Sequence, residues 1–231
     1  MVRGTLAETT ACAIGIPFPE RGLELDAVWS RGPLARALLV LAHGAGAGMR
    51  HPFVEAAARE LNVRGVDVLR YQFPYMQEGR RRPDPQGTLV AAVQAVIGHA
   101  SAESSLPLFA GGKSMGGRMT AIAASRGLLS EVTGLVFLGF PLHRQGAVSV
   151  ARAGHLEDIR QPMLFVQGTR DRLADLTSIR SVCDGLGDRA TLHIEEGGDH
   201  SFHILRRSGR TPDEVMASIS DRIASWIAEL S

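Results

Sequence analysis

Short apolar runs alternate with helical segments along most of this chain, and that order restricts the fold more than any other feature. The run Ala37 to Ala42 contains no polar residue, which is typical of a strand buried on both faces of a sheet. Further strands are predicted at Val66 to Tyr71, Leu106 to Ala110, Val132 to Leu138, Met163 to Gln167 and Ala190 to Ile194. We therefore expect an α/β fold, with a mostly parallel central sheet and helices on both faces.

Helix signals lie between these strands and after the last one. One predicted helix begins near Pro52, and two others cover Gln86 to Ala100 and Met119 to Ser125. A further helix, Arg152 to Ile159, is expected to form the crossover between two strands. The clearest signal is Thr211-Pro-Asp-Glu214, which has the pattern of a capping box with proline at the first helical position. Apolar residues then recur on one face of this last helix.

The length of 231 residues fits one domain, so we expect residues 1–231 to fold as a single unit. Residues 1–30 are expected to add antiparallel strands at the edge of the sheet. The connection from Gly139 to Pro162 must hold the crossover helix, which leaves only the loop Pro141 to Ala147. That loop is too short to have a core of its own, so no large cap domain is expected.

Charge and cysteine content exclude several classes of function. The chain has 25 basic and 24 acidic residues, a balance that argues against a nucleic-acid partner. Of the basic residues 24 are arginine, and Lys113 is the only lysine. Two distant cysteines, Cys12 and Cys183, form neither a metal site nor a disulfide framework by themselves.

No apolar stretch is long enough to span a bilayer, and the first residues lack the apolar core of a signal peptide, so we expect a cytoplasmic protein without a membrane partner.

The segment Gly112-Lys-Ser-Met-Gly116 matches the pattern G-x-S-x-G. It follows an apolar strand and precedes a helix, which is the context of a nucleophile elbow, and this makes Ser114 the candidate nucleophile. A phosphate-binding loop would need glycine at position 107, where Pro107 stands instead. The glycines from Gly44 to Gly48 do not match the dinucleotide pattern G-x-G-x-x-G either.

A serine nucleophile needs a base, and the base needs an acid that orients it. Asp171 follows the strand Met163 to Gln167, and His200 follows the strand Ala190 to Ile194 after a pair of glycines. Acid and then histidine is the order expected after an elbow serine. His203 is the competing histidine, and we favour His200 because of its position in the loop.

An oxyanion hole requires two backbone N–H groups. One is expected from Met115, the residue after the nucleophile. The other is expected from the loop that follows the first buried strand, at Ala45 or alternatively at Gly46.

Together these motifs make the sequence similar to the α/β-hydrolase superfamily, and more closely to the KANSL/TEX-type α/β-hydrolase-like family, relatives of the dienelactone hydrolases. The segments that carry the resemblance are His43 to Gly48, His51 to Phe53, Phe73 to Met76 with Gly79 to Pro83, Gly111 to Arg118, Gly139 to His143, Phe165 to Asp171 and Gly198 to Phe202. The resemblance implies an α/β-hydrolase fold and a Ser–Asp–His triad, with no cofactor and no metal. It implies no particular substrate.

The resulting hypothesis is a serine hydrolase that cleaves a small ester or thioester through an acyl-enzyme. The alternative is an interaction module of a larger assembly that kept the fold without the chemistry. Without a lid little apolar surface would cover a long acyl chain, so short acyl groups are expected. Arg80, Arg81 and Arg82 are expected to form a solvated loop, and alternatively they could bind an anionic substrate. His143 is a weaker candidate for facing the site. The natural substrate and the oligomeric state are not predicted.

Overall fold

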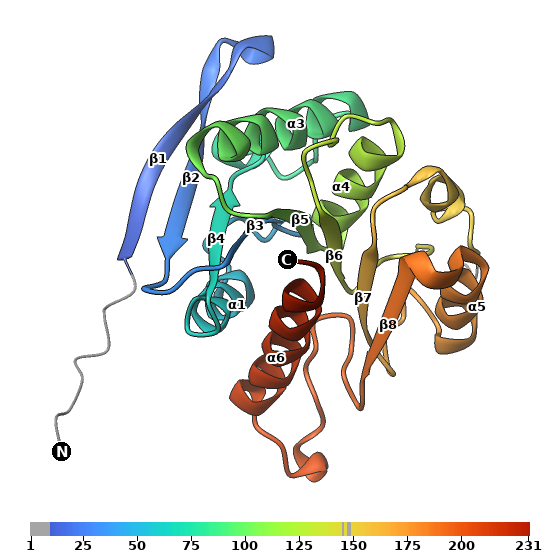
Figure 1. The fold of residues 1–231 in the computed structure, drawn as a ribbon. Helices are drawn as coiled ribbons and strands as arrows, with labels where there is room; N and C mark the ends of the chain where they lie inside the picture. The colour runs from blue at the N-terminus through green and yellow to red at the C-terminus, as the bar shows by residue number, and fades with distance from the viewer. Residues whose placement is uncertain (1–9, 145, 147–148) are drawn as a thin grey trace, which may run out of the picture.

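The computed structural model describes residues 10–144, 146 and 149–231, and a sheet of eight strands forms its centre (Figure 1). The strands lie in the order β1-β2-β4-β3-β5-β6-β7-β8. Their bounds are β1 Thr10–Phe18, β2 Leu23–Arg31, β3 Ala37–Ala42, β4 Val66–Tyr71, β5 Leu108–Lys113, β6 Gly134–Leu138, β7 Met163–Gly168 and β8 Ala190–Glu195. Strands β3 to β8 are parallel to one another, whereas β2 pairs antiparallel with both β1 and β4. Residues 1–9 of the predicted edge segment lie outside the described residues.

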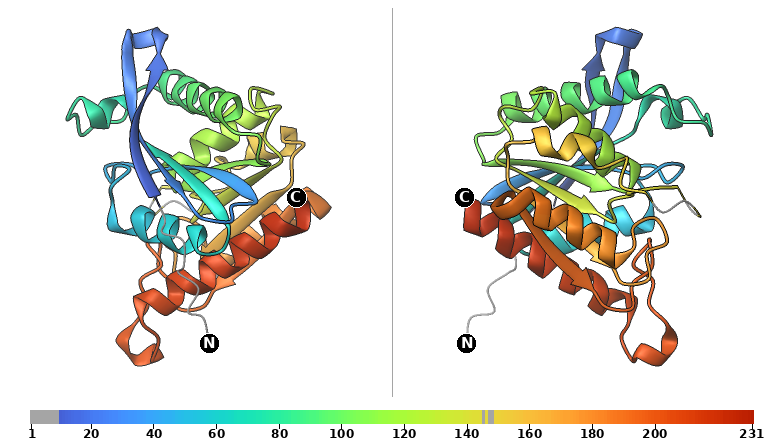
Figure 2. Two further views of the ribbon diagram at one scale, coloured as in Figure 1. Left: turned by 60° about the vertical axis from the view of Figure 1, so that its left-hand side comes forward. Right: turned by 90° about the vertical axis from the view of Figure 1, so that its right-hand side faces the viewer.

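Helices cover both faces of this sheet (Figure 2). Their bounds are α1 Pro52–Asn62, α2 Pro74–Gln77, α3 Gln86–Glu103, α4 Met115–Ser125, α5 Leu176–Leu186 and α6 Pro212–Leu230. Four short 3₁₀ turns lie at Pro19–Arg21, Gly154–Asp158, Gly187–Arg189 and Arg206–Ser208. The mostly parallel α/β architecture predicted from the sequence is confirmed, and no cap domain is found in the described part of the chain.

Alternate residues of each central strand enter two separate cores, because successive side chains of a strand point to opposite faces. In β3, Leu38 and Val40 belong to the core that also contains residues of α3, α4 and α5, while Leu39 and Leu41 belong to the core that contains residues of α1 and α6. All six residues of β3 are buried, as its continuous apolar run predicted. The capping box at the start of α6 is also present, with the Thr211 side chain accepting from the Glu214 N–H and the Glu214 carboxylate accepting from the Thr211 N–H.

The crossover helix predicted over Arg152 to Ile159 is wrong. The structure has only the 3₁₀ turn Gly154–Asp158 there, and Leu156 is its one buried residue. Gly154 lowers the helix propensity of the segment, and its apolar residues Ala153, Leu156 and Ile159 are already buried when it forms one short 3₁₀ turn. The predicted loop Pro141 to Ala147 includes residues 145 and 147, which lie outside the described residues.

Two boundaries near the predicted nucleophile also differ from expectation. Strand β5 continues to Lys113 instead of ending at Ala110, because Gly111 and Gly112 pair with β6 despite having no side chains. Helix α4 begins at Met115 instead of Met119, directly after Ser114. No helix in the described residues is both long and apolar enough to cross a membrane.

Candidate active site

Ser114 occupies a one-residue turn between β5 and α4. Its backbone has φ 51° and ψ −111°, a conformation that a residue with a side chain rarely adopts and that is costly outside functional sites. The backbone segments around the turn lie very close together. A β-carbon on Gly112 would lie 2.5 Å from the Ala42 carbonyl oxygen, and a β-carbon on Gly116 would lie 2.6 Å from the His43 carbonyl oxygen. Glycine at both positions therefore allows the sharp turn that the motif predicts.

Three side chains form a continuous line of hydrogen bonds at the carboxyl ends of β5, β7 and β8. The Ser114 Oγ lies 2.9 Å from His200 Nε2, and His200 Nδ1 lies 2.7 Å from Asp171 Oδ2. Since the carboxylate can only accept, Nδ1 carries the proton in this network and Nε2 is left to accept from the serine hydroxyl. The two residues that the sequence predicted as partners of Ser114 are thus in contact in the order serine, histidine, acid.

The carboxylate of Asp171 is buried and is held by two further donors. Gln167 Nε2 donates to Oδ2 at 2.6 Å, and the Leu173 N–H donates to Oδ1 at 2.7 Å. The sequence analysis predicted Gln167 only as the last residue of a strand and did not predict its contact with Asp171. A fully buried amide at the end of an apolar strand is a signal that it could have used, because buried polar groups require partners.

The loop that carries His200 is fixed by its own backbone contacts. A β-carbon on Gly168 would overlap the Gly198 carbonyl, so the loops after β7 and β8 touch directly. Asp199 does not contact the nucleophile; its Oδ1 accepts from the N–H groups of Ser201 and His203 at 2.8 and 2.9 Å. The ring of His203 is exposed and faces Asp199 at 3.5 Å instead of facing Ser114.

The loop after β3 supplies the second candidate oxyanion donor. His43 Nε2 accepts from the Phe73 N–H at 3.1 Å, so His43 Nδ1 donates to the Gly44 carbonyl at 2.7 Å. Burial lowers the pKa of His43 to about 4, which keeps the ring neutral in this role. The Gly46 N–H donates to the Tyr75 hydroxyl at 3.0 Å, whereas the N–H groups of Ala45 and Met115 have no partner among the described residues.

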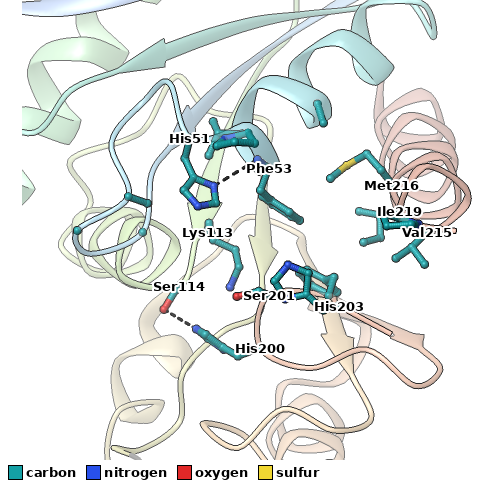
Figure 3. A pocket seen from close by; sticks show the side chains of 18 of the residues that line it. His51, Phe53, Lys113, Ser114, His200, Ser201, His203, Val215, Met216 and Ile219 are labelled. Atoms are coloured by element: carbon teal, nitrogen blue, oxygen red, sulfur yellow. Dashed lines mark hydrogen bonds between the residues drawn. The ribbon is translucent and has the colours of Figure 1, made fainter. Parts of the chain in front are cut away.

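A groove of about 740 Å³ opens beside the Ser114 hydroxyl (Figure 3). It runs between α1 and α6, and residues of the loops after β3 and β8 form its inner end. Lys113, Ser114 and His200 all line it. The volume lies within the range typical of sites for small molecules.

Four predicted candidates for substrate binding do not line this groove. Arg80 pairs with Glu78 at 2.6 Å and with Asp84 at 2.7 Å, so its charge is balanced by its own loop. Arg81 and Arg82 are exposed. His143 is buried, and its Nδ1 contacts the Arg144 carbonyl at 2.8 Å.

Asp175, four residues after Asp171, is the N-cap of α5 and accepts from the Ser178 N–H at 2.9 Å. In the described residues no group of three or more histidine, cysteine, aspartate or glutamate side chains is placed to hold a metal ion.

A mostly parallel sheet with a serine on a strand–turn–helix elbow is the architecture of the α/β hydrolases. Residues 35–228 match the family model described as an alpha/beta hydrolase domain. The chain therefore belongs to the alpha/beta hydrolase domain family.

Solved structures with the same fold cover almost the whole chain. A dienelactone hydrolase from Anabaena variabilis has a TM-score of 0.75 at 18% identity, over 96% of this chain and 98% of that one. The esterase Est1E from Butyrivibrio proteoclasticus, solved with ferulic acid, has a TM-score of 0.76 at 16% identity, over 94% of this chain and 100% of that one. An α/β serine hydrolase without a lid from Xanthomonas campestris has a TM-score of 0.70 at 20% identity, over 95% of each chain.

Proposed function

We propose that this protein is a serine hydrolase that cleaves a small carboxylic ester or thioester through an acyl-enzyme. The observation that carries the proposal is the unbroken line of hydrogen bonds from Ser114 through His200 to Asp171, at 2.9 and 2.7 Å. The proposal also fits an α/β-hydrolase fold that the chain shares with esterases and dienelactone hydrolases. We also propose that the chain is related more closely to the KANSL/TEX-type family, a relationship that specifies no substrate.

In the first half of the reaction Ser114 Oγ attacks the carbonyl carbon while its proton passes to His200 Nε2. The carbonyl oxygen becomes an oxyanion, and the N–H groups of Ala45 and Met115 are the proposed donors to it. The intermediate collapses, the bond to the alcohol or thiol breaks, and His200 protonates that leaving group. Asp171 holds the ring and stabilises the imidazolium throughout.

In the second half water attacks the acyl-enzyme, with His200 Nε2 accepting a proton from it. The second tetrahedral intermediate collapses, the bond to Ser114 Oγ breaks, and the serine regains its proton from His200. A carboxylic acid leaves, and the three residues return to their starting state. The chemistry requires no group beyond these side chains and backbone donors.

A fluorophosphonate probe tests the proposal, because such probes label a serine only when a neighbouring base activates it. We expect labelling at Ser114, located by mass spectrometry of the peptides. Ser114→Ala should lose the label, and Ser130→Ala, which removes an exposed serine beyond α4, should keep it. A folded wild-type protein that takes up no label would favour the alternative of a non-catalytic interaction module.

A further inference from the structure

The groove beside Ser114 has apolar walls contributed by two helices that are distant in sequence. Phe53, Val54 and Ala56 line it from α1, and the residues that line it from α6 are Val215, Met216 and Ile219. In Figure 3 these α6 side chains lie at the end of the groove opposite Ser114 and His200. The ring of Phe53 stacks on Phe202 with centroids 5.6 Å apart and planes 13° apart, which extends the apolar wall toward the nucleophile.

Between the two helices the polar side chains lie at the margin of this groove, and the buried polar residue Lys113 lines its inner end next to Ser114. His51, His203 and Asp213 are exposed, and His51 is engaged as the N-cap of α1 through its Nδ1. A substrate group that enters between the helices therefore meets mainly carbon atoms. The groove also holds far more than an acetyl group, since about 740 Å³ is the volume of a site for a whole small molecule.

We propose that the groove binds an apolar substituent of the ester, of the size of an aromatic ring or a branched alkyl chain. This inference rests on the proposed function and specifies its substrate class. It also changes the expectation of short acyl groups, which assumed that only a lid could supply apolar surface; α1 and α6 supply that surface from the body of the domain. Burial of each methylene group is worth roughly a factor of four in binding.

Two series of esters measured by proton release test the proposal. One keeps ethanol as the alcohol and varies the acid from acetate to butyrate to 3-phenylpropanoate. The other keeps acetate and varies the alcohol from ethanol to benzyl alcohol. We expect kcat/KM to rise at least about tenfold toward the phenyl-bearing ester in one series or both, and the series that responds shows which side of the ester enters the groove.

A variant that fills the groove provides the matching structural test. Ala56→Phe places a ring in the groove from a partly exposed position on α1, and it should lower kcat/KM for the phenyl-bearing ester about tenfold and that for ethyl acetate by a clearly smaller factor. Ala217→Phe is the control, since Ala217 is also partly exposed and does not line the groove.

Hydrolysis with no preference in either wild-type series overturns the groove assignment, and so does an equal loss on all esters in a folded Ala56→Phe. The wild-type series decides the matter even if the variant does not fold. Absence of hydrolysis together with absence of fluorophosphonate labelling would instead mean that the proposed function itself has failed.

Discussion

Asp171→Asn is expected to lower kcat by roughly 10⁴-fold on any ester that the wild type hydrolyses. Asparagine has nearly the same shape as aspartate. If its carbonyl oxygen keeps the bond from the Leu173 N–H, its NH₂ group takes the place of Oδ2, and the Gln167 amide must turn over to accept from it. An amide oriented with its NH₂ group toward His200 would, however, leave the wrong ring nitrogen protonated. It would also remove the charge that stabilises the imidazolium. Steady-state kinetics and a circular dichroism spectrum of the variant measure the two parts of this expectation.

Asp171→Asn made in a Ser114→Ala background tests whether the three residues act together as a triad or contribute independently. Since members of a triad act as a unit, Asp171→Asn should cost little further activity in a Ser114→Ala background. Asp175→Asn is the matched control, because Asp175 lies four residues later, caps α5 and has no contact with His200. Equal losses from Asp171→Asn and Asp175→Asn would exclude a catalytic role for Asp171.

Gly111→Ala is expected to have the largest effect on folding of any single methyl group added to this chain. Gly111 lies in the central strand β5 opposite Val136 of β6, and a β-carbon at this position would overlap the Val136 carbonyl. The obstacle is the backbone of a neighbouring strand, which cannot move without breaking the sheet. We expect a loss of about 4 kcal/mol or more in the free energy of unfolding, measured by chemical denaturation, or no soluble protein.

Gly98→Ala is the control for the same chemical change in open space. Gly98 lies within α3, and a β-carbon there would have no neighbour within 4 Å. Alanine in a helix interior is favoured over glycine, so this variant should be more stable than the wild type by about 0.5–1 kcal/mol. A Gly111→Ala protein as stable as Gly98→Ala would show that β5 and β6 are further apart than the structure has them.

The positions of most strands and helices were predictable because each depends on residues that are close together in the sequence. Strand β3 is marked by a continuous apolar run, and the start of α6 is marked by its capping box. The positions of both elements therefore followed from a few neighbouring residues. The order of Ser114, Asp171 and His200 was predictable for a related reason. Each follows the end of a parallel strand, and such ends meet at one edge of the sheet.

Features that depend on contacts between distant segments were not predictable. Gly154 alone does not predict that the crossover reduces to a 3₁₀ turn, because that outcome depends on how the segment packs in the folded chain. The choice between Ala45 and Gly46 depends on the Tyr75 hydroxyl, which lies 29 residues further along the chain and accepts from the Gly46 N–H. The groove has walls from α1 and α6, so its size and character exist only after the chain has folded.

Strand β8 is the edge of the sheet next to β7, and its residues from Ala190 to Ile194 are only partly buried. An edge strand has a neighbour on one side only, so it can fray at a lower free energy than the fully buried strands at the centre. His200 follows this strand, whereas Ser114 follows the fully buried β5. Local opening at β8 would therefore detach the proposed base while the nucleophile stays in place. We expect heat to inactivate the proposed hydrolase by a route that does not pass through global unfolding, with the opening of β8 setting its threshold.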